Sequence, residues 1–322
     1  RTKLHWSAGA NVRSGIAYGP AFGIDGSTVM VDRPDGTRVR EHLDVGENPP
    51  NGAVVYYWLD EDATGPVTLT FRDSAGRKIN AYASDDKDAP PARKPGTKAG
   101  LNRFVWDMKY PGPTRIDYAL APPRPKPLAP DPENPPGPTV VPGTYGVELG
   151  IGDKKDVATF TVVKDPRLST TPEDYAAQFA LHKELVASIS KLKQAVNRLR
   201  QTKRQLDEVG ERTGKGERAL RNRAAAIVRK LSAIEQVMVD PHRKSVRDVL
   251  RNPAGLNDTL MDMIAMATTA DAAPPTQTRA VSREVMDKVD SEVAKFEAIV
   301  EDDVAELNKA LTKARVPHVR AA

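Results

Sequence analysis

The chain contains no cysteine in its 322 residues. This excludes disulfides, thiolate nucleophiles and zinc sites with thiolate ligands. It does not fix the cellular compartment, because disulfides are optional even where they are stable. No apolar run approaches the roughly 18 residues that a membrane-spanning helix needs, so we expect no transmembrane segment. Aromatic residues are also scarce, at 5% of the sequence, which makes the position of each one informative.

The chain begins with RTKLHW, which is neither an initiator methionine nor a signal peptide. We therefore expect a mature or proteolytic fragment, or a piece cut from a longer protein. The length suits about two domains. Most of the 27 prolines and 22 glycines fall in residues 1–168, whereas residues 169–322 carry long periodic apolar patterns. These two ranges are the predicted domains.

Residues 1–168 are predicted to form an antiparallel β-sandwich that follows an N-terminal extension. Short apolar stretches alternate with polar residues, and no helical pattern separates them. A turn at Pro34-Asp35-Gly36 joins the first two. In the segment PVTLTFR, we expect Val67, Leu69 and Phe71 to point inward and the residues between them to face water. Further strands are predicted in GAVVYYWLDE, GRKINAYA, LNRFVWDM, GTYGVELGI and DVATFTVVKD.

A proline-rich segment, residues 111–142, separates two of these predicted strands. Proline lacks the backbone N–H that a central strand donates, so we expect a stiff, extended surface loop. Long surface insertions cost little stability, and Trp106 and Tyr145 can therefore lie on successive strands of one sandwich.

Residues 169–322 are predicted to form an α-helical bundle of about four amphipathic helices. The first helix is expected to begin at Thr170 or Thr171, with Pro172 in its first turn. The segments GERTGKGE, DPHRK and DAAPPTQT are predicted to break the helices, and the last helix is expected to run from about Ser282 to Ala314. The apolar stripe of the first helix is Leu185, Ile189, Leu192, Val196, Leu199 and Leu206.

Charge is unevenly distributed in this half. Residues 183–251 carry roughly +10 and residues 252–322 roughly −4, counting Lys and Arg against Asp and Glu. One interpretation is a site for nucleic acid or another anionic surface. The alternative, which we prefer, is that the basic helices face the acidic last helix. No stacking aromatic residues accompany the basic ones, so we expect no specific binding of nucleic acid.

No pattern of catalytic or metal-binding residues is present. The five histidines never occur at the spacing of a local metal site, and His182 is expected to be a packing or surface residue. Glycosidase chemistry needs two facing carboxylates; Asp60, Glu61 and Asp107 lie at predicted strand ends, but nothing pairs them. We expect no catalytic residue, no metal and no cofactor in this chain.

Parts of the chain resemble two known groups of proteins. The segments LTFRDSAGRKI, LNRFVWDM and VVPGTYGVEL resemble, in order, the immunoglobulin-like module of the flagellar hook-capping protein. This resemblance implies an immunoglobulin-like fold for the sandwich.

A longer resemblance spans residues 46–317 and rests on GENPPNGAVVYYWL, LNRFVWDMKYPGP, VPGTYGVEL, VKDPRLSTTPEDYAAQFAL, GLNDTL and ELNKAL. These segments resemble the C-terminal half of large exported bacterial proteins with sortilin-like or neuraminidase-type repeats, which are often labelled glycosyl hydrolases. The resemblance implies an upstream β-propeller and a periplasmic or extracellular location. Because the chain lacks the S-x-D-x-G-x-T-W blade motif, any activity of the propeller would lie outside it.

Three functions remain open at this point. The preferred hypothesis is a non-catalytic module for assembly or docking, whose partner is the propeller, another protein or a second copy. The second is an accessory part of a hydrolase whose active site lies on the propeller, and the third is a basic helical binder of anionic surfaces. The strand GAVVYYWLDE is apolar on both faces, so we expect Tyr57 and residues 111–142 to lie at an interface. An equal alternative is that Tyr57 packs under residues 1–45. The candidate interface residues are Tyr57, Trp58, Trp106, Tyr110 and Tyr145.

Overall fold

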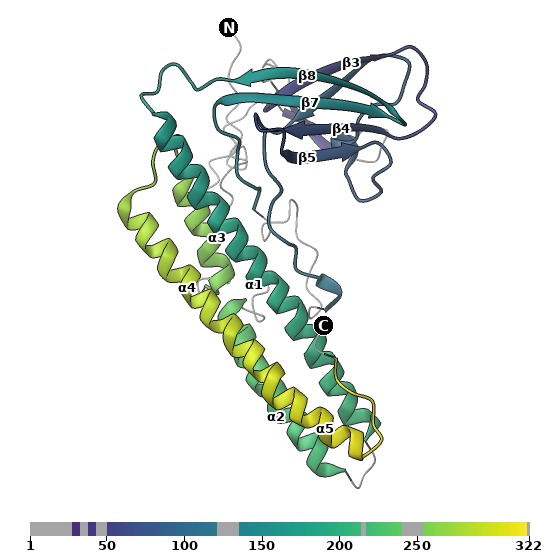
Figure 1. Ribbon diagram of the computed structural model, residues 1–322, viewed down its shortest axis with the longest axis vertical. Coiled ribbons are helices and arrows are strands. Elements are labelled where there is room, and N and C mark those ends of the chain that lie inside the picture. The colour runs from purple at the N-terminus through teal and green to yellow at the C-terminus, as the bar shows by residue number, and fades with distance from the viewer. Residues whose placement is uncertain are drawn as a thin grey trace. The chain divides into compact units, whose positions relative to one another are not determined.

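The computed structural model describes residues 28–32, 38–42, 50–120, 135–213, 217–239 and 254–320 (Figure 1). The chain combines antiparallel β-sheets with α-helices and divides into two compact units. The first unit comprises residues 1–108 and 146–159, and the second comprises residues 109–145 and 160–322. The proline-rich segment therefore groups with the helices.

The strands form three antiparallel arrangements. β1 pairs with β2, β3 pairs with β6, and the largest sheet has the order β5-β4-β7-β8. The predicted hairpin of β1 and β2 is confirmed, although its turn lies outside the described residues. The bounds are β1 (Thr28–Asp32), β2 (Arg38–His42), β3 (Ala53–Leu59), β4 (Val67–Arg72), β5 (Lys78–Ala83), β6 (Gly100–Trp106), β7 (Gly143–Ile151) and β8 (Lys154–Val162).

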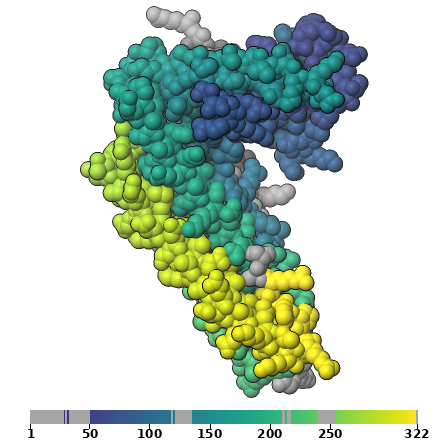
Figure 2. All heavy atoms as spheres, viewed as in Figure 1, coloured from purple at the N-terminus to yellow at the C-terminus, as the bar shows by residue number. Residues whose placement is uncertain are grey.

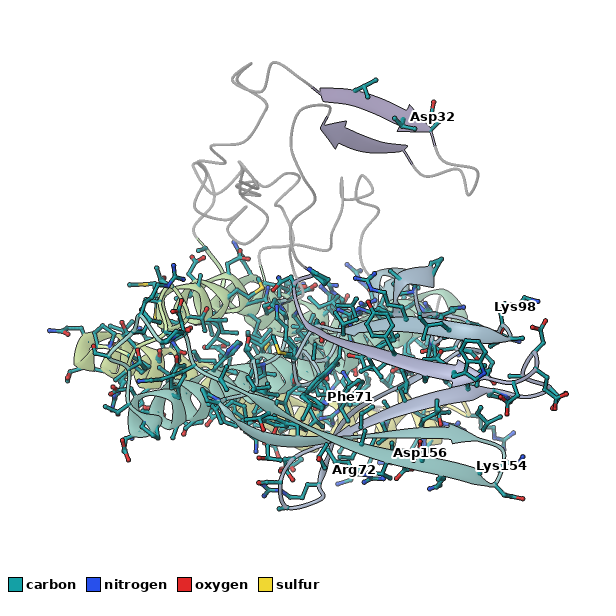
Figure 3. The ribbon with its side chains drawn as sticks, turned by 90° about the horizontal axis from the view of Figure 1, so that it is seen from above. Asp32, Phe71, Arg72, Lys98, Lys154 and Asp156 are labelled. Atoms are coloured by element: carbon teal, nitrogen blue, oxygen red, sulfur yellow. The ribbon has the colours of Figure 1, made fainter. Side chains whose placement is uncertain are left out.

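Aromatic rings join the β3–β6 sheet to the larger sheet. The ring of Phe71 on β4 stacks on Trp106 of β6 at 4.2 Å between ring centroids, and Tyr82 of β5 contacts Phe104 at 4.9 Å. As predicted, Val67, Leu69 and Phe71 are fully buried. Successive side chains of a strand point to opposite faces, and Figure 3 labels Phe71 beside its half-exposed neighbour Arg72.

The second unit is built on one 41-residue helix, α1 (Pro172–Arg212). Thr171 is its N-cap: the Thr171 hydroxyl accepts from the Asp174 N–H, while the Asp174 carboxylate accepts from the Thr171 N–H. This reciprocal pair confirms the predicted start, because it satisfies backbone donors that the helix leaves open. The other elements are α2 (Arg218–Met238), α3 (Leu256–Ala267), α4 (Thr276–Ile299), the π-helical turn η6 (Val300–Val304), α5 (Ala305–Lys313) and the short 3-10 turns η3 (Pro91–Arg93) and η4 (Tyr118–Leu120).

The helices share one apolar core. α2 and α3 both pack against α1, and α4 packs against all three (Figure 1). The predicted apolar stripe of α1 is completely buried in this core. From α4 to α5 the chain runs as one continuous strip of yellow-green to yellow atoms in Figure 2. Among the described helices, none combines the length and the apolarity that crossing a bilayer requires.

The last helix begins about two turns earlier than predicted. The helix begins at Thr276 instead of Ser282, because Pro275 can precede a helix as its N-cap and the first turn tolerates polar residues. Thr278 and Ser282 are both buried, so this segment, whose sequence resembles a linker, lies partly in the interior.

The described parts of the proline-rich segment are bound to α1. The Asn197 side chain accepts from the Asp117 N–H at 2.8 Å and donates to the Arg115 carbonyl at 3.1 Å. The Thr114 N–H donates to the Ser190 hydroxyl. The segment is therefore held by specific hydrogen bonds, and in addition it contributes the buried side chain of Ile116 to the helical core.

Candidate functional site: an exposed aromatic surface

Strand β3 presents two apolar faces, and only one of them is buried. Tyr57 and Leu59 lie in the interior, while Trp58 is 65% exposed and Tyr56 is 59% exposed. The alternation is the ordinary two-residue period of a strand. The sequence indicated two apolar faces. In the structure, the face that carries Tyr56 and Trp58 is exposed.

Strand β6 completes this surface. In the antiparallel register, Trp58 lies opposite Leu101, and Tyr56 lies opposite Arg103. Leu101 is 67% exposed, and Arg103 is exposed as well. Opposed residues of an antiparallel pair carry their side chains on the same face, so the exposed side chains form one contiguous patch. We call it the β3–β6 face; its residues are Val54, Tyr56, Trp58, Leu101 and Arg103.

Polar contacts on this face are few. The indole N–H of Trp58 donates to the Asp60 carboxylate at 3.1 Å, which fixes the orientation of an otherwise exposed ring. Among the described residues, Arg103 forms no ion pair. Trp, Tyr and Arg are the residues that contribute most often to binding energy at protein interfaces, and all three occur here.

Tyr57 and Trp106, by contrast, lie in the interior. Tyr57 is 8% exposed, and its hydroxyl donates to the Gly96 carbonyl at 2.7 Å. Burial raises the pKa of the Tyr57 hydroxyl, while the hydrogen bond to Gly96 acts in the opposite direction. Trp106 is fully buried against Phe71. A partner could reach neither ring without opening the sheets, so the surface available for docking is centred on Trp58.

Tyr110 and Tyr145 belong to the second unit. The half-buried ring of Tyr110 lies 5.1 Å from Phe179 of α1. Tyr145 is buried, and its hydroxyl donates to the Val141 carbonyl at 2.6 Å. Both rings therefore lie at the ends of the proline-rich segment, and the five sequence candidates are divided between the two units.

Two of the three carboxylates considered for hydrolysis bind other side chains, and the third is exposed. Asp107 binds the Arg93 guanidinium at 2.8 Å and accepts a longer hydrogen bond from the Tyr82 hydroxyl. Burial, followed by the Asp107 charge, raises the pKa of Tyr82 to about 12. Asp60 orients Trp58, and Glu61 is exposed. Within the part of the chain that the structure describes, no three His, Asp or Glu side chains group as metal ligands would.

The basic helices face acidic residues of the last helical segment. Lys191 pairs with Asp290 at 2.7 Å, and Lys230 pairs with Asp303 at the same distance. Two further pairs, Arg198–Glu297 and Arg223–Glu306, continue the pattern. These contacts support the second interpretation of the charge pattern, in which the acidic helix compensates the basic ones.

Leu101 was missing from the residues expected at the interface. Counting back from the inward Trp106 in steps of two reaches Phe104 and Asn102, which leaves Leu101 on the outer face. The sequence could have indicated Leu101 as an interface residue, because the alternation of β6 places this leucine on the outer face.

No protein-family model matches the chain, and no curated protein is similar enough to it to count as a relative.

Proposed function

We propose that this chain is a non-catalytic interaction module that docks onto another protein through the β3–β6 face. The observation that carries the proposal is the exposure of Trp58, Tyr56 and Leu101, each more than half exposed, on one contiguous patch. Large exposed apolar patches on a folded chain are typical of interaction sites, because they lower the free energy when a partner covers them.

The architecture we propose for this module is an immunoglobulin-like sandwich followed by a helical bundle. The stacking of Phe71 on Trp106 supports the sandwich, and the single core shared by the helices supports the bundle. The resemblance to exported sortilin-like proteins favours a periplasmic or extracellular location and a β-propeller as the partner. The exposed guanidinium of Arg103 favours a partner surface with a carboxylate at the matching position.

Site-directed photo-crosslinking tests the proposal in the cells that make the protein. A photoreactive residue at position 58 or 101 should capture one and the same protein, and Arg103→Glu should abolish the capture by charge repulsion. The matched control is position 157, since Val157 is equally exposed but lies on β8. Capture of that protein from position 157 with equal yield would contradict the proposed surface.

Sedimentation distinguishes a second copy from a different partner. If the partner is another copy, Trp58→Ser should shift a dimer to a monomer while the monomer keeps its fold, because the ring is exposed. Turnover of glycosides or peptides by the repurified chain, lost on replacing Asp107 or Glu61, would show instead that the module is catalytic.

A further inference from the structure

Residues 315–320, which we call the tail segment, run along the surface of the helical core. They follow α5 and lead back toward α1 (Figure 1). Val319 is 3% exposed and belongs to the helical core, and Val316 packs against the same core. The remaining residues of the segment are exposed. The tail segment is therefore an extended strip on the surface that is anchored by two apolar side chains.

Two amide side chains hold the backbone of the tail segment. Asn308 on α5 donates to the Val319 carbonyl at 2.9 Å and accepts from the Val319 N–H at 2.9 Å. Gln205 on α1 makes the same pair of bonds with Arg320, at 2.8 and 2.7 Å. A primary amide carries both a donor and an acceptor, so it can satisfy both backbone groups of one residue, as a neighbouring strand would.

These contacts recognise a backbone and one side-chain position. Any extended segment can supply the backbone groups, whereas the site of the buried Val319 admits an aliphatic side chain of similar size. The hydroxyl of Thr312 on α5 adds a polar contact, 2.6 Å from the Nε2 atom of His318. All the recognising groups belong to α1 and α5, which form the groove under the tail segment.

The turn that directs the tail segment back over the helices is strained. Arg315 has a φ of 58°, a left-handed conformation that costs free energy for a residue with a Cβ atom. The Arg315 N–H donates to the Thr312 carbonyl and the Val316 N–H donates to the Leu311 carbonyl, which completes the end of α5. Glycine is the usual residue at such a position. The strain opposes the docked position and favours release of the segment from the groove.

We propose that the groove between α1 and α5 is a binding site for an extended segment of another protein, and that the tail segment occupies it as an internal ligand. A partner segment with valine or isoleucine at the position of Val319 would take the bonds of Asn308 and Gln205 in its place. The site lies in the second unit, whereas the β3–β6 face belongs to the first.

Another protein is a more favourable occupant than a second copy of this chain. The tail segment of a second copy makes only the contacts that the closed chain already has. It also lacks the tether that keeps the chain's own segment at a high effective concentration. A partner segment that continues past these contacts along the helices gains additional ones and can therefore displace the tail segment.

A fluorescent peptide with the sequence of residues 315–322, RVPHVRAA, tests the proposal by anisotropy. In the unaltered chain the tail segment competes with the peptide. Val319→Asp in the chain should release the tail segment, because a carboxylate without a partner is costly to bury. If the released state of the unaltered chain is populated at about 0.1–10%, the Val319→Asp chain should bind the peptide about 10- to 1,000-fold more tightly.

A second substitution assigns the binding to the groove. Asn308→Leu, added to the Val319→Asp chain, removes two hydrogen bonds and should weaken binding of the peptide about 5- to 150-fold. Gln201→Leu is the matched control, because Gln201 is exposed on α1 one turn before Gln205, and it should leave the affinity unchanged. A peptide with aspartate in place of its second valine should bind neither chain.

Four results would overturn the proposal. They are equal affinity for the unaltered and the Val319→Asp chains, no binding to the Val319→Asp chain, equal effects of Asn308→Leu and Gln201→Leu, and loss of the helical circular dichroism in the Val319→Asp chain. In the last case the tail segment would be a part of the core that the helices need, and not a ligand. A dimer of the unaltered chain that Val319→Asp dissociates would overturn the choice of another protein in favour of a second copy.

Discussion

The buried carboxylate of Glu235 offers a direct test of what holds the helices together. Glu235 lies on α2 and is 4% exposed. It accepts hydrogen bonds from Arg200 Nε at 2.7 Å and from Lys203 Nζ at 2.9 Å, both on α1. The variant Glu235→Gln keeps the size of the side chain and removes its charge, which leaves the equally buried guanidinium of Arg200 without a counter-ion.

The expected loss is about 3–5 kcal/mol in the free energy of unfolding, the usual cost of removing one partner of a buried ion pair. An exposed pair is the matched control. Lys230 of α2 pairs with Asp303 of the last helical segment, and both side chains reach solvent. Asp303→Asn should therefore lower the free energy of unfolding by about 1 kcal/mol or less. The contrast between the two variants therefore isolates the effect of burial.

The pH dependence provides a second measurement of the same contact. Burial acts to raise the pKa of Glu235, but the hydrogen bonds from Lys203 and Arg200 outweigh it and lower the pKa below its ordinary value of 4.5. A carboxylate whose pKa is lowered by folding stabilises the folded state above its ordinary pKa. This contribution disappears as the pH falls through the lowered value. The difference between the parent chain and Glu235→Gln should therefore shrink in strong acid.

Urea unfolding followed by circular dichroism measures both effects. A loss below about 1 kcal/mol for Glu235→Gln, or a loss equal to that of Asp303→Asn, would refute the reasoning. The double variant Arg200→Met, Glu235→Leu should remain close to the parent in stability, because apolar residues of similar size can replace a buried pair. Lys203 is more exposed than its partners and can turn toward water in this variant.

Three further predictions concern other contacts. Tyr57→Phe removes the hydrogen bond to Gly96, and we expect unfolding measurements to show a loss of about 1 kcal/mol with no change in sedimentation. Gly137→Ala would place a methyl group 2.1 Å from the Tyr110 carbonyl oxygen, so differential scanning calorimetry should show a loss of about 1–3 kcal/mol. Gly65→Ala is the matched control and should lose less, because nothing lies within 4 Å of the added methyl group. Burial lowers the pKa of His182 to about 4. As the pH falls from 6.5 to about 4, the unfolded chain protonates its histidine at position 182 before the folded chain does. The free energy of unfolding should therefore decrease by up to about 3 kcal/mol over this range, and His182→Phe should remove this decrease.

Features determined by neighbouring residues were predictable from the sequence. The capping residues Thr171 and Asp174 are three positions apart, and the alternation of Val67, Leu69 and Phe71 needs no knowledge of distant contacts. Period and capping are local consequences of backbone geometry, so the strands and the start of α1 could be identified from the sequence.

Features that depend on residues far apart in the chain could not be predicted from the sequence. The side chain of Asn197 binds backbone groups 80 and 82 positions earlier, and no local pattern marks an asparagine for that role. For the same reason the grouping of residues 109–145 with the helices did not follow from their proline content. Strand β3 posed a related difficulty, because its two faces are similarly apolar, and alternation alone cannot say whether Tyr57 or Trp58 points inward.

The charge pairing between α1 and the last helical segment has a consequence for biosynthesis. Arg198 precedes Glu297, its partner, by 99 residues, and Lys191 precedes Asp290 by the same number. At about 5–20 residues per second, a ribosome needs about 5 to 20 seconds to supply the acidic partners. During that interval the apolar stripe of α1 lacks α4, and Lys191 and Arg198 lack the carboxylates that later pair with them. The contacts on this side of α1 are therefore completed only after the last helical segment has been synthesised.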